Sequence, residues 1–242
     1  MRYSPSVYIW FDGRGFFHKL PLYVIQTKLY TNNMNVREAY DQWAEQYDTN
    51  QNKTRDLEAV SLQQALSGFH FIRTLEIGCG TGKNTKWLQT ISDEILAIDL
   101  SNEMLTIAKA KVSSHRVIFQ QADITKSWNF AIGTFDLVTF SLVLEHINQL
   151  TPVFEKVYNV LKPGGKVYIG ELHPFKQYSG TKARFNTEQG AQIVTCFNHH
   201  ISDFTAGSKH VGFDVEIINE YFDDNDRQTI PRILTLLLKK PI

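Results

Sequence analysis

The sequence predicts one α/β domain with a doubly wound, mostly parallel sheet that ends in antiparallel structure. Between residues 73 and 170, short apolar segments alternate with helical patterns. This alternation is typical of right-handed crossovers between parallel strands, with helices on both faces of the sheet. Near the C-terminus, two apolar segments are separated by only about ten residues, too few for a crossover helix. These two segments should therefore pair as an antiparallel hairpin.

Two helices are expected before the first strand. Four apolar or aromatic residues recur at spacings of four, three and four, which places them on one helical face: Val36, Tyr40, Trp43 and Tyr47. Asn35 is suited to cap the first turn, and Glu38 stands at the reciprocal capping-box position. The second helix, Thr54–Leu66, is expected to end near Gly68.

The alternating region contains five expected strands: Arg73–Ile77, Glu94–Ile98, Arg116–Gln120, Phe135–Phe140 and Lys166–Gly170. Between them, helical patterns run over Lys83–Ile91, from Ser101 onward, and over Thr151–Leu161. The C-terminal pair is Phe213–Tyr221 and Arg232–Lys239. No internal repeat, low-complexity tract or linker divides this region, so one domain is the simplest interpretation.

The first 33 residues form an aromatic-rich segment that charges and glycines interrupt, a pattern that fits a secretory signal poorly. We expect residues 1–33 to be an extension that packs on the domain or stays mobile. Met34 directly precedes a good helix start, which suggests the hypothesis that translation begins there. The domain is then expected over residues 34–242, with covering helices within 35–67 and a substrate-side insertion over 171–210.

Composition narrows the class of protein. The chain has 25 basic and 25 acidic residues, whereas nucleic-acid binders usually carry excess Lys and Arg. We therefore expect no nucleic-acid partner. Cys79 and Cys196 stand far apart, outside any metal-ligand spacing, which favours a reducing, cytoplasmic compartment and no structural metal. No apolar run approaches the roughly 20 residues that cross a bilayer, so no membrane association is expected.

A glycine-rich turn follows the first strand and is the strongest local motif. Gly78, Gly80 and Gly82 lack the Cβ atoms that would stop a ligand from approaching the main chain closely. A turn that leads into a helix is typical of pyrophosphate binding in dinucleotide enzymes. Here, however, Lys83 stands where the pattern G-x-G-x-x-G requires its third glycine, and no G-K-[ST] phosphate loop is present.

Two carboxylates follow the next two strands. Asp99 lies about 20 residues beyond the first glycine, where an acid can accept hydrogen bonds from both ribose hydroxyls of an adenosine. Asp123 is suited to accept from the exocyclic amine of adenine, with Ile124 packed on the ring. The alternative for each aspartate is a capping role, although Ser101 is better placed than Asp99 to cap the following helix.

These elements resemble the class I S-adenosylmethionine-dependent methyltransferases over roughly residues 34–240. The resemblance rests on five motifs in the family's order: Glu76-Ile77-Gly78-Cys79-Gly80-Thr81-Gly82, Asp99-Leu100-Ser101, Ala122-Asp123, Phe135-Asp136-Leu137-Val138 with Leu144-Glu145-His146, and Leu161-Lys162-Pro163-Gly164-Gly165. It implies a seven-stranded sheet whose last strand is antiparallel. This agrees with the C-terminal hairpin predicted from spacing alone.

The resemblance also implies S-adenosyl-L-methionine as cofactor and assigns residues to it. The turn that contains Gly78, Cys79 and Gly80 would hold the methionine part, and Glu76 would orient its ammonium group. The adenosine part would contact Asp99, Leu100, Met104, Asp123 and Ile124, while Ser141 would contact the cofactor through its main chain. Tyr47 lies on the first helix, which in this family folds over the cofactor.

The acceptor side is predicted less sharply. Ligands of open α/β sheets lie beyond the carboxyl ends of the strands, so candidate acceptor contacts are Tyr40, His146, Tyr178 and Arg184. A base near neutral pKa helps when the acceptor must lose a proton. His173, which follows the fifth strand, and His199, which lies in the insertion, are the candidate bases. A carboxylate acceptor would need none, since alignment alone then suffices.

The sequence therefore predicts a methyltransferase that acts on a small molecule. The alternatives are methylation of a protein or tRNA, and a non-catalytic module that retains the cofactor site. A dinucleotide-dependent dehydrogenase is the weakest interpretation, because the third glycine is missing. Neither the acceptor nor the oligomeric state follows from the sequence.

Overall fold

The computed structural model describes residues 35–49, 51–187 and 190–242. The predictions for residues 1–33 and for initiation at Met34 lie outside this part of the chain. Within it, no helix is long and apolar enough to cross a membrane.

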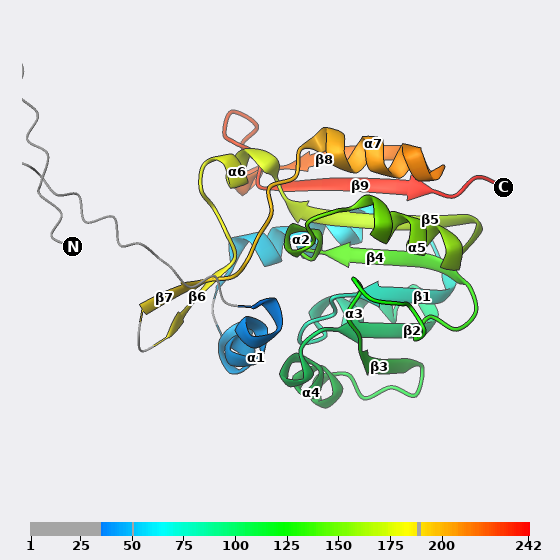
Figure 1. Cartoon of the computed structure of the whole chain (residues 1–242), viewed down its shortest axis with the longest axis horizontal. Helices are drawn as coiled ribbons and strands as arrows, with labels where there is room; N and C mark the ends of the chain where they lie inside the picture. The colour runs from blue at the N-terminus through cyan, green and yellow to red at the C-terminus, as the bar shows by residue number, and fades with distance from the viewer. Residues whose placement is uncertain (1–34, 50, 188–189) are drawn as a thin grey trace, which may run out of the picture. The chain divides into compact units, whose positions relative to one another are not determined.

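A seven-stranded sheet forms the centre of the described domain (Figure 1). Its order is β3-β2-β1-β4-β5-β9-β8, and its strands are β1 (Phe71–Ile77), β2 (Ser92–Asp99), β3 (Val117–Gln121), β4 (Phe135–Ser141), β5 (Leu161–Leu172), β8 (Asp214–Tyr221) and β9 (Ile233–Lys239). Strands β1 to β5 pair in parallel, whereas β9 is antiparallel to both β5 and β8. The predicted fold class and the C-terminal hairpin are confirmed.

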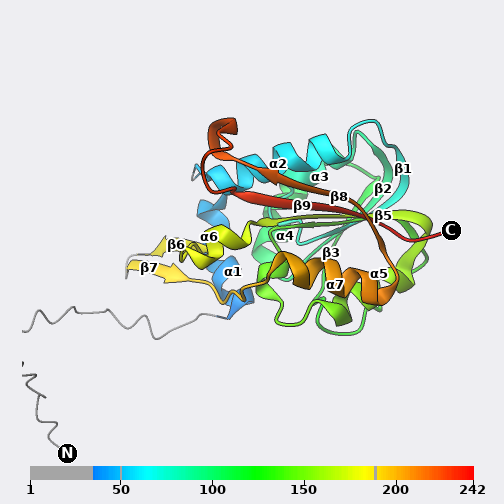
Figure 2. The same ribbon diagram turned by 90° about the horizontal axis from the view of Figure 1, so that it is seen from above.

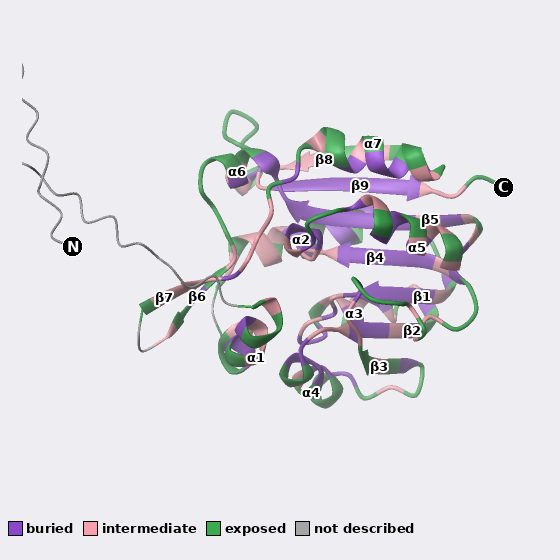
Figure 3. Ribbon diagram, viewed as in Figure 1, coloured by how far each residue is buried: buried purple, intermediate pink, exposed green. Residues whose placement is uncertain are grey.

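Helices cover both faces of this sheet, as Figure 2 shows for α2 and α3 on one side and α5 and α7 on the other. The bounds of these helices and of α4 are α2 (Lys53–Ala65), α3 (Lys83–Leu88), α4 (Asn102–Lys111), α5 (Thr151–Val160) and α7 (Ile201–Val211). Leu62, Leu88 and Leu105 join one buried cluster, and Phe154 and Phe204 join the cluster on the opposite face. The central strands β1, β4, β5 and β9 are mostly buried between the two clusters, whereas the edge strands β3 and β8 are more exposed (Figure 3).

The strand order reverses between β1 and β4, so their carboxyl ends diverge into the crevice where open α/β sheets bind ligands. Helix α1 (Val36–Tyr47) lies beyond this end of the sheet (Figure 1). It begins at Asn35, whose side chain accepts from the Arg37 N–H as predicted. Ser101 caps α4, and its hydroxyl donates to Asp41 at 2.6 Å, which ties α1 to the sheet.

A short helix and a hairpin occupy the predicted insertion. They are α6 (Pro174–Tyr178) and the two-stranded sheet of β6 (Arg184–Thr187) and β7 (Gly190–Ile193). Phe185 of β6 stacks on Trp43 of α1, with ring centroids 5.4 Å apart, inside a third small apolar cluster. The hairpin and α1 therefore form one cover with its own core, separate from the two cores of the main sheet.

Candidate functional site

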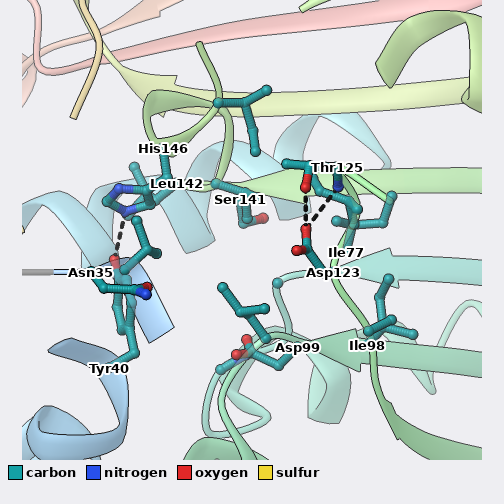
Figure 4. A pocket seen from close by; sticks show the side chains of 18 of the residues that line it. Asn35, Tyr40, Ile77, Ile98, Asp99, Asp123, Thr125, Ser141, Leu142 and His146 are labelled. Atoms are coloured by element: carbon teal, nitrogen blue, oxygen red, sulfur yellow. Dashed lines mark hydrogen bonds between the residues drawn. The ribbon is translucent and has the colours of Figure 1, made fainter. Parts of the chain in front are cut away.

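A pocket of about 270 Å³ opens at the carboxyl ends of β1, β2 and β4, beside α1 (Figure 4). It brings together ten residues for which the sequence predicted ligand contacts: Tyr40, Tyr47, Gly78, Gly80, Asp99, Leu100, Asp123, Ile124, Ser141 and His146. These residues come from five separate stretches of chain, and the topology of the sheet makes them neighbours.

The glycine-rich turn forms one wall of the pocket. Gly78 and Gly80 have φ of +71° and +53°, in the left-handed region that side chains rarely adopt. The N–H groups of Gly78 and Cys79 both donate to the Ile98 carbonyl, at 2.8 and 3.0 Å. The turn is thereby fixed to β2, and its backbone faces the pocket.

Asp99 holds the same turn from the end of β2. One carboxylate oxygen accepts from the Gly80 N–H at 2.8 Å, and the other accepts from the Ser101 N–H at 2.8 Å. Burial raises the pKa of Asp99, and these backbone donors oppose that shift. A pyrophosphate bound to this turn would meet a carboxylate in place of free N–H groups, so the geometry disfavours a dinucleotide.

Asp123 lines the pocket opposite Asp99 (Figure 4). One of its oxygens accepts from both the N–H and the hydroxyl of Thr125, at 2.9 and 2.6 Å. The capping alternative is thus observed for this oxygen. Ile124, buried beside it, supplies an apolar wall.

A smaller cavity of about 50 Å³ adjoins the turn and contains charges of both signs. Glu58 and Glu76 are its buried acids, and Arg55 and Lys83 are its bases. Burial raises the pKa of Glu76 to about 8, and the hydroxyl of Thr85 donates to its carboxylate at 2.5 Å. The predicted residue Cys79 is buried and lines this cavity.

Arg55 and Glu58 were not predicted to belong to the site. The guanidinium of Arg55 lies 4.0 Å from the ring centroid of Tyr47. Glu58 accepts from the amide of Asn84 at 2.9 Å and from the hydroxyl of Tyr168 at 3.0 Å. The sequence feature that could have predicted both residues is their spacing of three on α2, which places the two side chains on one helical face.

The other end of the pocket lies between α1 and the segment that follows β4. The hydroxyl of Tyr40 and Nε2 of His146 are 2.9 Å apart. A dashed line marks this contact in Figure 4. Leu142 has a φ of +58°, unusual for a side chain with a Cβ and costly in energy. Glu171, at the end of β5, accepts from the N–H groups of Val143 and Leu144 at 2.9 and 2.7 Å and so fixes this segment.

The two histidines predicted as bases, His173 and His199, do not line the pocket. His173 is fully buried; its Nδ1 accepts from the Phe175 N–H, and its Nε2 donates to Glu220 at 3.0 Å. His199 is also buried, and its Nε2 lies 2.8 Å from the Ile147 carbonyl. His173 caps α6, and His199 anchors the segment after β4.

Three further residues with predicted ligand contacts, Tyr178, Arg184 and Met104, also lie away from the pocket. Tyr178 is exposed and its hydroxyl lies 2.5 Å from Nδ1 of His200, while Arg184 is exposed on β6; neither lines the pocket. Met104 is completely buried in α4 and does not line the pocket either. Its N–H instead donates to Ser101, so Met104 is part of the helix start.

Because His199 braces two carbonyls, we expect its loss to affect stability and not the pocket. The His199→Ala variant should lose about 1–3 kcal/mol of unfolding free energy, since the Ile147 and Leu144 carbonyls lose their donor. Its affinity for S-adenosylhomocysteine should stay within about twofold of the wild type. Denaturant melts and calorimetry measure these two quantities. A tenfold loss of affinity without loss of stability would contradict the bracing role.

Comparisons with known proteins agree with this geometry. A family model described as a methyltransferase domain matches residues 75–169. An uncharacterized methyltransferase of Emericella nidulans is 23% identical over 83% of each chain. A ubiquinone biosynthesis O-methyltransferase of Xanthomonas oryzae is 29% identical over 61% of each chain, so the match spans less than two thirds of that relative.

Solved structures share the fold. A putative S-adenosylmethionine-dependent methyltransferase from Listeria monocytogenes has a TM-score of 0.66, with 23% identity over 77% of this chain and 99% of the other. The complex of DhpI with SAM and HEP has a TM-score of 0.67, with 21% identity over 87% of this chain and 100% of the other. The family match identifies residues 75–169 as a methyltransferase domain, and the described domain as a whole has the fold of S-adenosylmethionine-dependent methyltransferases.

Proposed function

We propose that this enzyme methylates a small molecule held in the pocket between the glycine-rich turn and α1. The observation that carries the proposal is that the two ends of the pocket are lined by different chemical groups. One end presents Asp99 and Asp123, and the other presents the Tyr40–His146 pair beneath α1. A pocket of this size at the edge of a covering helix suits a metabolite better than a macromolecular surface.

The residues present fit the cofactor by the chemistry of their donors and acceptors. Asp99 would accept the two ribose hydroxyls, and Asp123 the adenine amine, with Leu100 and Ile124 against the ring. The methionine end of S-adenosylmethionine is a zwitterion, and the smaller cavity offers the complementary set of Glu76 and Arg55. When bound, the cofactor supplies an electrophilic methyl group on sulfur, and the protein supplies alignment and exclusion of water.

Distant relatives support a small acceptor. The 29% identical relative is named an O-methyltransferase of ubiquinone biosynthesis. The balanced charge of this chain, with 25 basic and 25 acidic residues, provides little attraction for nucleic acid. Both lines of support favour a metabolite over tRNA.

The test is a screen of metabolite extracts with methyl-labelled S-adenosylmethionine, followed by mass spectrometry of the molecules that acquire label. We expect label in the small-molecule fraction, and none when Asp99→Ala replaces the wild type. Label that enters only the protein or RNA fraction would contradict the proposal.

Cofactor binding should release a proton from Glu76. Its pKa of about 8 leaves the side chain mostly neutral at pH 7, and an ammonium group nearby would favour the charged form. Calorimetry of S-adenosylhomocysteine binding in two buffers of different ionisation enthalpy should therefore show about one proton released per site. Glu76→Gln should abolish the release. Glu94→Gln, at an exposed position on β2, is the control and should retain it.

The raised pKa of Glu76 also makes the stability of the fold depend on pH. Glu76 is protonated in the folded state and ionised in the unfolded state between its ordinary value of 4.5 and about 8. The folded state then binds more protons, so its contribution to stability falls as pH rises through this window. Thermal melts without cofactor should decline from about pH 5 to pH 8, and less so in Glu76→Gln. An equal decline in both proteins would assign the effect to other groups.

A further inference from the structure

The Tyr40–His146 pair has a defined hydrogen-bond direction. Nδ1 of His146 lies 2.7 Å from the Thr195 carbonyl, which only accepts, so Nδ1 carries a proton. Nε2 of the neutral ring is then an acceptor, and the Tyr40 hydroxyl donates to it at 2.9 Å. The remaining lone pair of the Tyr40 oxygen is free to accept a hydrogen bond from a molecule in the pocket.

A buried carboxyl group, Glu145, lies beside the His146 ring. Oε1 of Glu145 lies 3.9 Å from Nε2, and Oε2 of the same buried side chain has no hydrogen-bond partner among the described residues. Burial raises the pKa of Glu145, and the nearby His146 opposes that rise. Burial also raises the pKa of Tyr40, and Tyr47, Glu145, Cys196 and Asp99 raise it further. The Tyr40 phenol is therefore protonated at rest, and it can pass its proton to His146 only while it takes up another.

Glu145, His146 and Cys196 each place a potential metal-ligand atom within 4.8 Å of the others. Both ring nitrogens of His146 already have partners, however, and the Cys196 sulfur lies 3.8 Å from Nδ1, which carries the proton. Burial raises the pKa of Cys196 to about 12, so its thiol is not ready to bind a cation. The hydrogen-bonded chain uses the histidine in a way that metal binding would disrupt.

The end of the pocket near Tyr40 and His146 is otherwise lined by uncharged side chains. Beside Tyr40 and His146, the pocket is lined there by Asn35, Val36, Leu142, Val143 and Ile147. Within residues 35–49, 51–187 and 190–242, no Lys or Arg lines this pocket. An acceptor with a carboxylate or phosphate would lose its hydration without gaining a Lys or Arg side chain as a partner, which is costly. The lining fits a neutral, largely apolar molecule with a hydroxyl group.

We propose that Tyr40 and His146 form a proton relay that serves a neutral hydroxyl acceptor, a phenol being the simplest example. This rests on the proposed function and names its acceptor class. As the acceptor oxygen forms its bond to the methyl carbon, the methyl–sulfur bond breaks and leaves its electron pair on sulfur. The acceptor O–H proton passes to the Tyr40 oxygen, and the Tyr40 proton passes to Nε2 of His146. The imidazolium, facing Glu145, later returns its proton to water.

The chain contains a matched control for this pair. Tyr178 and His200 are also hydrogen-bonded, at 2.5 Å, but Tyr178 is exposed and neither residue lines the pocket. Substitutions there remove the same chemical groups without access to the pocket.

The probe for the test is 4-nitrophenol, a neutral phenol whose ionised form absorbs at a separate wavelength. It is titrated with the full chain saturated with S-adenosylhomocysteine, so no methyl transfer occurs. In the wild type, the acid dissociation constant of the bound phenol should rise about tenfold or more over its value in solution, because its proton moves to His146. Tyr40→Phe and His146→Gln should lose this rise, while Tyr178→Phe and His200→Gln should keep it. 4-Nitrobenzoate, a carboxylate of similar shape, should bind at least about tenfold more weakly at the same pH.

Three outcomes would overturn the relay: failure of the wild type to bind 4-nitrophenol, binding with unchanged ionisation, or a rise that survives in both pocket variants. A stoichiometric metal ion in the purified protein that His146→Gln removes would assign the cluster to metal binding instead. Calorimetry of S-adenosylhomocysteine on the same proteins separates the two proposals. If the wild type does not bind S-adenosylhomocysteine, the proposed function is contradicted. If it binds S-adenosylhomocysteine but does not raise the acid dissociation constant of bound 4-nitrophenol, only the relay is contradicted.

Discussion

Asp99→Ala is expected to weaken S-adenosylhomocysteine binding by about 10²–10⁴-fold. The carboxylate would accept two ribose hydroxyls, and a hydrogen bond to a charged group contributes about 1.5–3 kcal/mol. Because Asp99 also accepts from the Gly80 and Ser101 N–H groups, the substitution loosens the turn that faces the methionine end. Titration calorimetry of the wild type and the variant measures the ratio, and NAD should bind neither protein.

Two further variants separate binding from folding. Asp99→Asn keeps the shape of the side chain but loses its charge, so it should retain the fold and still bind at least about tenfold more weakly. Asp93→Ala removes an exposed aspartate of the same strand, paired with His70, and should bind like the wild type. Wild-type affinity in Asp99→Ala would show that this carboxylate does not hold the ribose.

Gly78→Ala should be among the most destabilising single-methyl additions to the described domain. Its φ of +71° costs a residue with a Cβ about 1–2 kcal/mol. The added Cβ would also lie 2.2 Å from Cγ2 of Val143, an overlap that forces the turn or the segment after β4 to move at a further cost of about 1–3 kcal/mol. Since both segments line the pocket, cofactor affinity should fall together with stability.

Gly180→Ala measures the conformational cost of a positive φ by itself, without the steric overlap. Gly180 has a φ of +86° with no atom within 4 Å of an added Cβ, so only the conformational cost applies. Val143→Ala combined with Gly78→Ala should relieve the overlap and recover about 1–3 kcal/mol relative to the sum of the single changes. Denaturant melts of the four variants measure this coupling, and additive single effects would show that Val143 is not the obstacle.

The sheet could be predicted because each of its strands and crossover helices has a recognisable pattern within a short stretch of sequence. Each buried strand is a short apolar run, each crossover helix has its own periodicity, and the distance between the last two strands excludes a crossover. The proximity of Asp99 and Asp123 could be predicted for a related reason. Residues that follow adjacent parallel strands meet at one edge of the sheet, and this does not depend on which side chains they carry. The pocket confirms that they lie together, and their roles toward the cofactor remain predictions.

The histidines were not predictable in the same way. His173 follows β5 as expected, but whether it faces the pocket or caps a helix depends on Pro174 and on Glu220, 47 residues away. The Tyr40–His146 contact joins residues separated by 106 positions, and no periodicity encodes it. The hairpin of β6 and β7 escaped notice because its strands have four residues each and little alternation of apolar and polar residues.

The cover formed by α1 and this hairpin has an evolutionary consequence. Its apolar cluster of Ala39, Trp43, Phe185 and Val194 is separate from both cores of the sheet. Mutations of Phe185 and Val194 therefore leave the packing of both cores of the sheet unchanged, whereas α1 is tied to the sheet through Asp41 and Ser101. A lineage of such enzymes can therefore vary the hairpin, residues 184–194, while Tyr47 and the pocket residues at the edge of the sheet are inherited unchanged.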